Sequence, residues 1–180
     1  MIMTYQQCIK IYHSDYLLKK RLVDKELFKV EKGIYSNTKN FSRLEVISAK
    51  YPKAIFTLDS ACYYYSLTDV VPDQYHVMTS KDGAKMKEKD IKQYFMLEDY
   101  LMKGVETLDI NGISIKIYSK ERLLVEILRY KNKLPYDYYK EIIGHYRRII
   151  TQLDIETIQE YAMMLPKSQM VMEILQSEVF

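Results

Sequence analysis

The stretch "SDYLLKKRLVDKELFKVEKGIYSN", residues 14–37, decides how the first part of the chain folds. Ser14 is a preferred residue type at the N-cap of a helix, and Asp15 suits the positive end of the helix dipole. The segment "LFKVEKGIY" then alternates apolar and polar residues as a strand does, and Gly33 supplies the positive φ that a three-residue hairpin loop needs. We therefore expect a short basic helix followed by a lysine-rich, two-stranded ribbon.

The expected helix has two faces of different character. At 100° per residue, its apolar arc is formed by Leu17, Leu18 and Leu22, whereas the other side carries Tyr16, Lys19, Lys20 and Val23. Arg21 projects within the apolar arc, so it has to reach the edge of the arc or find a carboxylate. Ahead of this helix, "TYQQCIKIYH" predicts an amphipathic helix whose apolar stripe consists of Ile2, Tyr5, Cys8, Ile9 and Tyr12.

Two short helices followed by a ribbon form the layout of a winged helix-turn-helix. In that layout the second helix enters the DNA major groove and the wing approaches the phosphate backbone. The charge distribution agrees, because residues 1–50 contain ten Lys and Arg against five Asp and Glu, whereas residues 51–180 contain 17 against 19. The candidate DNA-contacting residues are Ser14, Tyr16, Lys19 and Lys20 on the helix, and Lys29 and Lys32 on the wing. The alternative interpretation is a solvated basic face on a small folding unit.

The polar segment "SNTKN" reads as a linker, which gives a DNA-binding module at residues 1–38 and a second domain at residues 41–180. Ser42 and Glu45 form a capping box at the start of a helix. Asn111-Gly112 is a strong signal for a two-residue hairpin turn. Asp59 or Ser60 should cap a helix in "DSACYYYSL", and a series of helices should follow the turn, with Ser119 and Asp154 as two of the N-caps. The expected fold class is α+β: a minimal N-terminal winged helix-turn-helix, then a mixed α+β domain that ends in a helical bundle.

The sequence contains few signals of catalysis. It has no phosphate-binding glycine loop and no nucleophile-elbow motif, and its three histidines, His13, His76 and His145, show no metal-ligand spacing. Cys8 and Cys62 suggest no disulfide framework, and neither a signal peptide nor an apolar run of membrane-spanning length is present. We expect a cytoplasmic protein without enzyme activity, cofactor or metal, and without contact with a membrane.

Three longer segments follow one another in a characteristic order, namely "LFKVEKGIYSN", "AIFTLDSACYYYSLTDVVPDQYHVMTSK" and "INGISIKIYSKERLLVEILRYKNKLPYDYYKEII". Their shared elements are a basic helix and ribbon ending in "GIY", an "SA" helix running to "LTD", a "P-x-x-Y-x-V-x-T" strand and an "S-K-E-R-L" helix start. In this order they resemble the AbiEi-type antitoxins of bacterial type IV toxin–antitoxin and abortive-infection systems, which act in phage defence. The resemblance covers nearly the whole chain.

The resemblance implies that the N-terminal winged helix binds operator DNA and represses its own operon. It also implies that the rest of the chain counteracts a toxin of the nucleotidyltransferase class, without a required complex between the two proteins. The sequence departs from longer members, because it lacks their first helix and has no Gly before the wing, so the DNA-binding module is minimal. Two alternatives stay open: a module that neutralises a toxin by direct contact, and a nucleotidyltransferase-like enzyme, for which no paired-carboxylate motif is present.

Overall fold

The computed structural model describes residues 1–180, and the chain forms two compact units of mixed α+β structure. The first unit comprises residues 1–53 together with 111–114, and the second comprises residues 54–110 and 115–180. The first unit extends beyond the boundary expected at residues 38–41, because a helix formed by Arg43–Lys50 packs on two of its strands. Independent folding of residues 41–180 stays a prediction.

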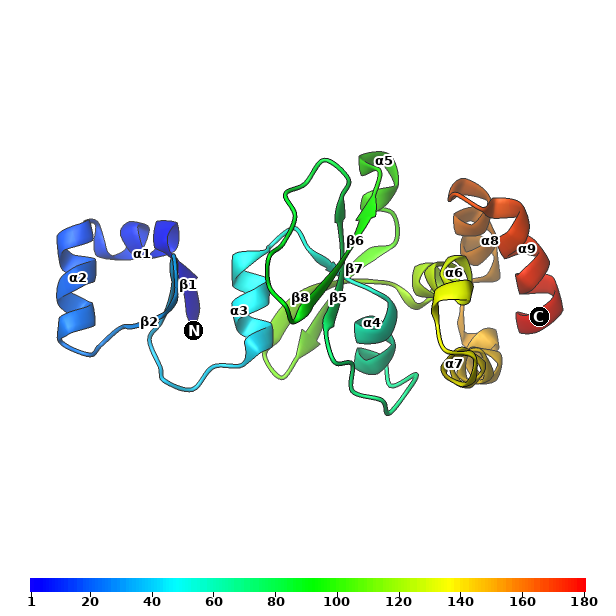
Figure 1. Ribbon diagram of the computed structural model, residues 1–180, viewed down its shortest axis with the longest axis horizontal. Coiled ribbons are helices and arrows are strands. Elements are labelled where there is room, and N and C mark those ends of the chain that lie inside the picture. Colours follow the sequence, from blue (N-terminus) through cyan, green and yellow to red (C-terminus); the bar gives the residue numbers. More distant parts are fainter. The chain divides into compact units, whose positions relative to one another are not determined.

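The first unit contains a small antiparallel sheet and three helices. In chain order they are β1 (Ile2–Thr4), α1 (Tyr5–Tyr12), α2 (Asp15–Val23), β2 (Phe28–Glu31), β3 (Ile34–Ser36) and α3 (Arg43–Lys50) (Figure 1). The strands lie in the order β1-β3-β2. The expectation that Ile2 extends the stripe of the first helix is wrong. Thr4 and Gln7 form a capping box that starts α1 at Tyr5 and leaves Ile2 in an edge strand.

The core of the first unit is formed by both helices of the predicted pair and by the sheet. Its buried side chains are Met3, Cys8, Leu18, Leu27 and Tyr35. The ribbon turns as predicted, with Gly33 at φ +78°, and a register shift between Lys29 and Glu31 accommodates the turn. The capping box of Ser42 and Glu45 at the start of α3 is also confirmed.

The second unit contains a five-stranded mixed sheet. Its first part comprises β4 (Ile55–Phe56), α4 (Leu58–Tyr64), β5 (Tyr75–Ser80), β6 (Ile91–Met96), α5 (Glu98–Leu101), β7 (Val105–Ile110) and β8 (Ile113–Tyr118). The strand order is β6-β5-β4-β8-β7, in which β4 is antiparallel to β5 but parallel to β8, and β5 is parallel to β6. Strand β5 is almost continuously buried, as a strand covered on both faces should be.

Two local features set the geometry of this sheet. The turn between β7 and β8 has Asn111 at φ +53° and Gly112 at φ +82°, the two positive values of the predicted type I′ turn. Helix α4 does not begin with a side-chain cap from Asp59 or Ser60, as the sequence suggested. It begins after Thr57, whose side chain makes no capping hydrogen bond, and Leu58 adopts φ +43° as the chain leaves β4.

Helices dominate the remainder of the second unit. They are α6 (Lys120–Arg129), η1 (Lys131–Lys133), α7 (Tyr136–Ile149), η2 (Ile150–Gln152), α8 (Ile155–Met164), α9 (Ser168–Ile174) and η3 (Leu175–Val179). Ser119 and Asp154 cap α6 and α8 as predicted. Helix α6 is buried from Arg122 to Leu128 and packs against α4, α8 and α9. No helix combines the length and the apolar character needed to cross a membrane.

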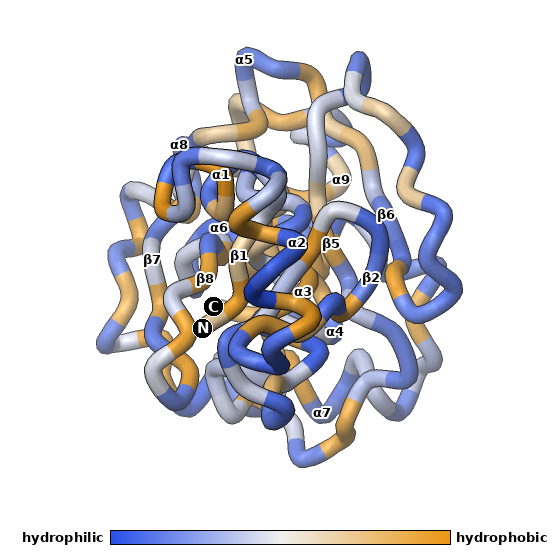
Figure 2. The backbone as a smooth tube through the Cα atoms, turned by 90° about the vertical axis from the view of Figure 1, so that its left-hand side faces the viewer, coloured by the Kyte–Doolittle hydropathy of each residue, from blue (hydrophilic) through white to orange (hydrophobic).

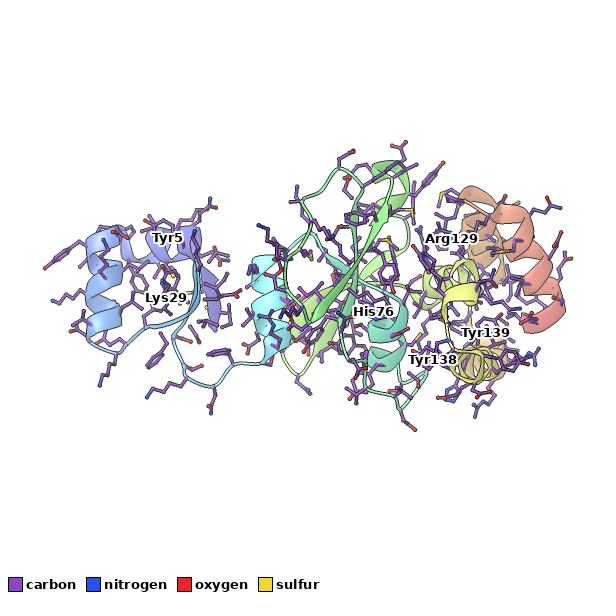
Figure 3. The ribbon with its side chains drawn as sticks, viewed as in Figure 1. Tyr5, Lys29, His76, Arg129, Tyr138 and Tyr139 are labelled. Carbon is purple, nitrogen blue, oxygen red and sulfur yellow. The ribbon has the colours of Figure 1, made fainter.

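A buried ionic cluster joins α6 to the segment before β7. The guanidinium of Arg122 donates to Glu126 Oε1 at 3.0 and 2.8 Å and to the carbonyl oxygens of Tyr100 and Lys103 at 3.2 Å each. Arg129, which is labelled in Figure 3, also donates to both carboxylate oxygens of Glu126, at 2.8 and 2.7 Å. Because both side chains of the Arg122–Glu126 pair are fully buried, these bonds are needed to compensate for their lost hydration.

Candidate nucleic-acid interface

Helix α2 is oriented by the side chains that it buries. Leu18 lies in the core of the first unit and Leu22 packs against that core, whereas Leu17 remains 43% exposed at the edge of the apolar arc. Ser14 occupies the N-cap, and its hydroxyl accepts a hydrogen bond from the backbone N–H of Leu17 at 3.1 Å. The hydroxyl therefore fixes where α2 begins. The tube of α2 in Figure 2 shows the resulting mixture of hydrophobic and hydrophilic residues.

The outward side of α2 carries the residues that the sequence assigned to it. Tyr16 is 75% exposed, Val23 is 79% exposed, and Lys19 and Lys20 are exposed between them. No carboxylate pairs with Lys20. This side of the helix thus presents two large apolar side chains on either side of two cations.

Lys19 differs from Lys20 because it already has an anionic partner. Its Nζ lies 2.7 Å from Asp15 Oδ2, and the hydroxyl of Tyr5 donates to the other oxygen of Asp15 at 3.3 Å. The hydrogen bond with Lys19 lowers the pKa of the Asp15 carboxyl, and the same contact raises the pKa of Lys19. Lys19 must exchange this carboxylate for any phosphate that it binds, so we expect it to contribute less than Lys20.

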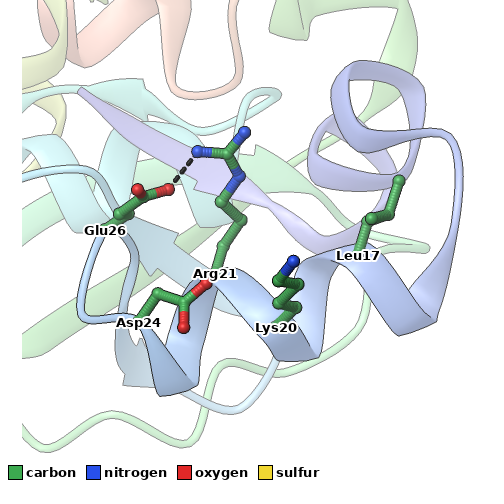
Figure 4. A pocket seen from close by; sticks show the side chains of 5 residues that line it. All are labelled: Leu17, Lys20, Arg21, Asp24 and Glu26. Carbon is green, nitrogen blue, oxygen red and sulfur yellow. Dashed lines mark hydrogen bonds and ion pairs between the residues drawn. The ribbon is translucent and has the colours of Figure 1, made fainter.

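Arg21 finds a carboxylate, as the sequence analysis required. It pairs with Glu26 from the turn after α2, and its guanidinium lies 5.9 Å from the centre of the Tyr12 ring. Arg21 and Glu26 line a pocket of about 240 Å³ together with Leu17, Lys20 and Asp24. Figure 4 shows these five side chains and the ion pair. The pocket contains two cations and two carboxylates, so it has no net preference for an anion.

The ribbon presents two further cations to solvent. Lys29 lies on β2 (Figure 3) and Lys32 lies in the turn, and neither side chain forms an ion pair. The one carboxylate of the ribbon belongs to Glu31. It is held by Lys50 of α3, whose Nζ lies 3.0 Å from Glu31 Oε1, and a guanidinium nitrogen of Arg43 lies 4.0 Å from Glu31 Oε2. The negative charge of the ribbon is therefore balanced by α3 and does not oppose Lys29 and Lys32.

One cation of the first unit was not among the residues predicted from the sequence. Lys39 belongs to the segment read as a linker, yet its Nζ lies 5.5 Å from the ring centre of Phe28 on β2. This contact places a further positive charge beside the ribbon. The pairs Asp15–Lys19 and Glu31–Lys50 were also missed. The first had a visible signal, since an acidic residue four positions before a lysine on a helix favours pairing.

The second unit contains a polar cluster around the side chain of His76, which is buried and only 4% exposed. Its Nε2 lies 3.5 Å from Asp59 Oδ2, and its Nδ1 lies 3.4 Å from the Tyr94 hydroxyl. Burial lowers the pKa of His76 to about 4 and raises that of Asp59. Tyr138, labelled with His76 in Figure 3, adds a buried hydroxyl. Nowhere do three His, Cys, Asp or Glu side chains gather as metal ligands.

The chain was compared with known proteins. It matches no protein-family model, and it matches no curated protein.

Proposed function

We propose that the chain is a bacterial antitoxin of the AbiEi type, which binds operator DNA through its first unit and represses its own operon. The observation that best supports this proposal is the pattern of charges in the first unit. Lys20, Lys29 and Lys32 are exposed without a carboxylate partner, whereas the neighbouring carboxylates of Glu26 and Glu31 are both paired with cations. Three free lysines beside carboxylates that are mostly paired give the surface an excess of available positive charge, which suits a polyanion.

The order of elements supports a winged helix-turn-helix as the DNA-binding device. Strand β1 is followed by α1, α2 and the β2–β3 ribbon, and β3 pairs with both other strands. In the proposed mode, α2 is the recognition helix and the ribbon is the wing. Ser14 then sets the start of the recognition helix, and Tyr16, Lys19 and Lys20 face the groove. Lys29 and Lys32 contact the phosphate backbone, which positions the helix without reading sequence.

The second unit is the proposed carrier of antitoxin activity against a nucleotidyltransferase-type toxin. Its support is the resemblance of the chain to AbiEi-type antitoxins, together with a separate core around α6 that does not depend on the lysine-bearing residues. Two compact units permit two separable tasks, although a fold alone does not assign a function. In this proposal the second unit acts without catalysis of its own.

The DNA-binding half is tested with labelled duplexes tiled across the promoter of the chain's own operon. Fluorescence anisotropy at a series of salt concentrations should show binding to one tile, with a slope of log K against log salt of about −0.9 for each phosphate neutralised. Simultaneous replacement of Lys19, Lys20, Lys29 and Lys32 by Ala should remove most of that slope. Equal binding by the fourfold variant at every salt concentration would contradict the proposal.

The antitoxin half is tested by co-expression with a nucleotidyltransferase-type toxin, from promoters that this protein does not control. Cells with the full chain should grow, and cells with residues 54–180 should grow as well. Cells with residues 41–180, the range predicted from the sequence, should also grow. This chain differs from residues 54–180 by retaining α3, which then lacks the strands that it packs on. If rescue requires the first unit while the toxin level is constant, the proposed division of tasks is wrong. Co-purification of toxin and antitoxin would instead favour neutralisation by direct contact.

A further inference from the structure

The outward side of α2 contains an apolar residue, Val23, that has no part in binding phosphates through charge. Val23 is 79% exposed, the largest exposure among the large hydrophobic side chains of the chain. It is absent from the core of the first unit, which contains Leu18 of the same helix and is packed against by Leu22. At an exposed helical position a β-branched residue is also less favourable than Lys, Arg or Glu. Neither packing nor helix formation therefore accounts for Val23.

The position of Val23 relative to the other outward residues suggests what it contacts. Tyr16 and Val23 are seven residues apart, which corresponds to about 10.5 Å along an α-helix and to about three base-pair steps of duplex DNA at ~3.4 Å each. Lys20 lies between them, three residues before Val23, and has no carboxylate partner. The same face thus offers a free cation with an apolar group on either side.

The major groove contains one kind of apolar group that such a face can contact. Guanine presents two acceptors there, cytosine and adenine present amino donors, and thymine alone presents a methyl group, at C5. Lysine pairs with guanine O6 and N7, whereas an aliphatic side chain gains only from the thymine methyl. Because α2 and the ribbon carry positive charge, DNA fits this face better than an apolar protein partner does.

We infer that Val23 is a specificity-determining residue, which packs against the C5-methyl group of a thymine close to the base pair that Lys20 contacts. The inference rests on the proposed DNA-binding function, and it adds to that function a base and the residue that reads it. It extends the reading surface beyond Tyr16, Lys19 and Lys20 to the last residue of α2. Binding then depends on a single methyl group of the operator, which can be removed without altering base pairing.

The test uses the full-length protein and the promoter tile that it binds. Each thymine of that tile is replaced in turn by deoxyuridine, which lacks the methyl group and retains the base-pairing edge. The wild-type protein should lose about fourfold in affinity at one of these positions, the effect of burying one methyl group. Val23→Ala should weaken binding to the thymine duplex by a similar factor, and the deoxyuridine substitution should then cause no further loss.

A matched control and the outcomes that would overturn the inference complete the test. Val71→Ala replaces a valine of the second unit that is 66% exposed. This variant should bind the thymine duplex and the deoxyuridine duplex with the same affinities as the wild-type protein. The inference is overturned if Val23→Ala binds the thymine duplex as wild type does, or if the variant still responds to deoxyuridine. It is overturned as well if the variant loses self-association in sedimentation while its DNA affinity is unchanged. Failure of wild-type protein to bind any tile is different, because it removes the proposed function itself.

Discussion

Arg21 on α2 and Glu26 in the following turn form an ion pair beside the outward face of the helix (Figure 4). Both side chains are about half exposed, so the pair contributes little to folding stability. The pair has a larger effect on the positive charge that is available to bind a polyanion. A guanidinium that is engaged with a carboxylate is not available to a phosphate, and Glu26 adds a negative charge close to Lys20. In the proposed function, the pair therefore limits the affinity of this surface for DNA.

Replacement of Glu26 by Gln should strengthen DNA binding. The substitution removes one negative charge and releases Arg21 for a phosphate, so the slope of log K against log salt should become steeper by about one unit. Salt titrations by fluorescence anisotropy measure both changes. Glu160→Gln serves as the control, because it removes an exposed carboxylate of α8 in the second unit and should leave the slope unchanged. Weaker binding by Glu26→Gln would show that Glu26 supports the interface.

Lys19 and Lys20 should differ in their contributions to DNA binding, although they are adjacent. Lys20→Ala should reduce the salt slope by about one unit, because its cation has no competing partner. Lys19→Ala should reduce the slope by less, because Lys19 must first leave Asp15. Asp15→Asn should increase the slope and make Lys19→Ala as damaging as Lys20→Ala. Equal losses for the two lysine variants in the wild-type background would contradict this ranking.

The stability of the second unit should depend on pH through His76. Its pKa is lowered from 6.5 to about 4 in the folded state, so the unfolded chain takes up a proton first as the pH falls. Stability should therefore decrease between pH 6.5 and 4, by up to about 3 kcal/mol from this residue. The pKa of Asp59 is raised, so its contribution changes in the opposite direction and offsets part of the loss.

Urea unfolding at pH 7 and pH 4.5 separates the two residues. His76→Gln should show a smaller loss of unfolding free energy on acidification than wild type, because the buried imidazole is gone. Asp59→Asn should show a larger loss, because the compensating carboxyl is gone. Lys92 acts on both groups and is unchanged in both variants. If the stability of His76→Gln depended on pH as that of the wild type does, His76 would not be the source of the acid sensitivity.

Glu126 should be among the residues on which folding of the second unit depends most. Replacement by Gln leaves the buried cation of Arg122 without a carboxylate and should lower the free energy of unfolding by about 3–5 kcal/mol. Chemical denaturation monitored by circular dichroism measures the loss. Glu121→Gln on the same helix is the matched control, since Glu121 makes no ion pair or hydrogen bond and should change stability little. Similar stabilities of the two variants would contradict the role of the cluster.

Features determined by neighbouring residues could be predicted from the sequence. Ser14, Ser42, Ser119 and Asp154 cap helices as expected, and Asn111-Gly112 forms its turn, because a cap or a tight turn involves only a few consecutive residues. The exposed side of α2 was also predictable, because the positions of its leucines fix which side faces the core.

Features determined by distant residues could not be predicted in the same way. The parallel pairing of β5 with β6 and of β4 with β8 depends on the whole sheet and leaves no mark in local periodicity. The full burial of His76 could not be predicted, since nothing in its own segment shows that Asp59 and Tyr94 surround it. Glu31 is balanced by Lys50 of α3, 19 positions later in the sequence, so the free cations of the ribbon emerge only in the folded unit.

Each compact unit contains one cysteine with a free thiol, Cys8 in the first and Cys62 in the second, and both side chains have no solvent exposure. Burial raises the pKa of both thiols, so they react with a thiol reagent only when their surroundings open. The chain thus has two native reporters of local unfolding, and no label has to be engineered. Mass spectrometry of the modified peptides can follow the opening of each unit in the same sample. Operator DNA should slow the modification of Cys8 and leave that of Cys62 unaffected.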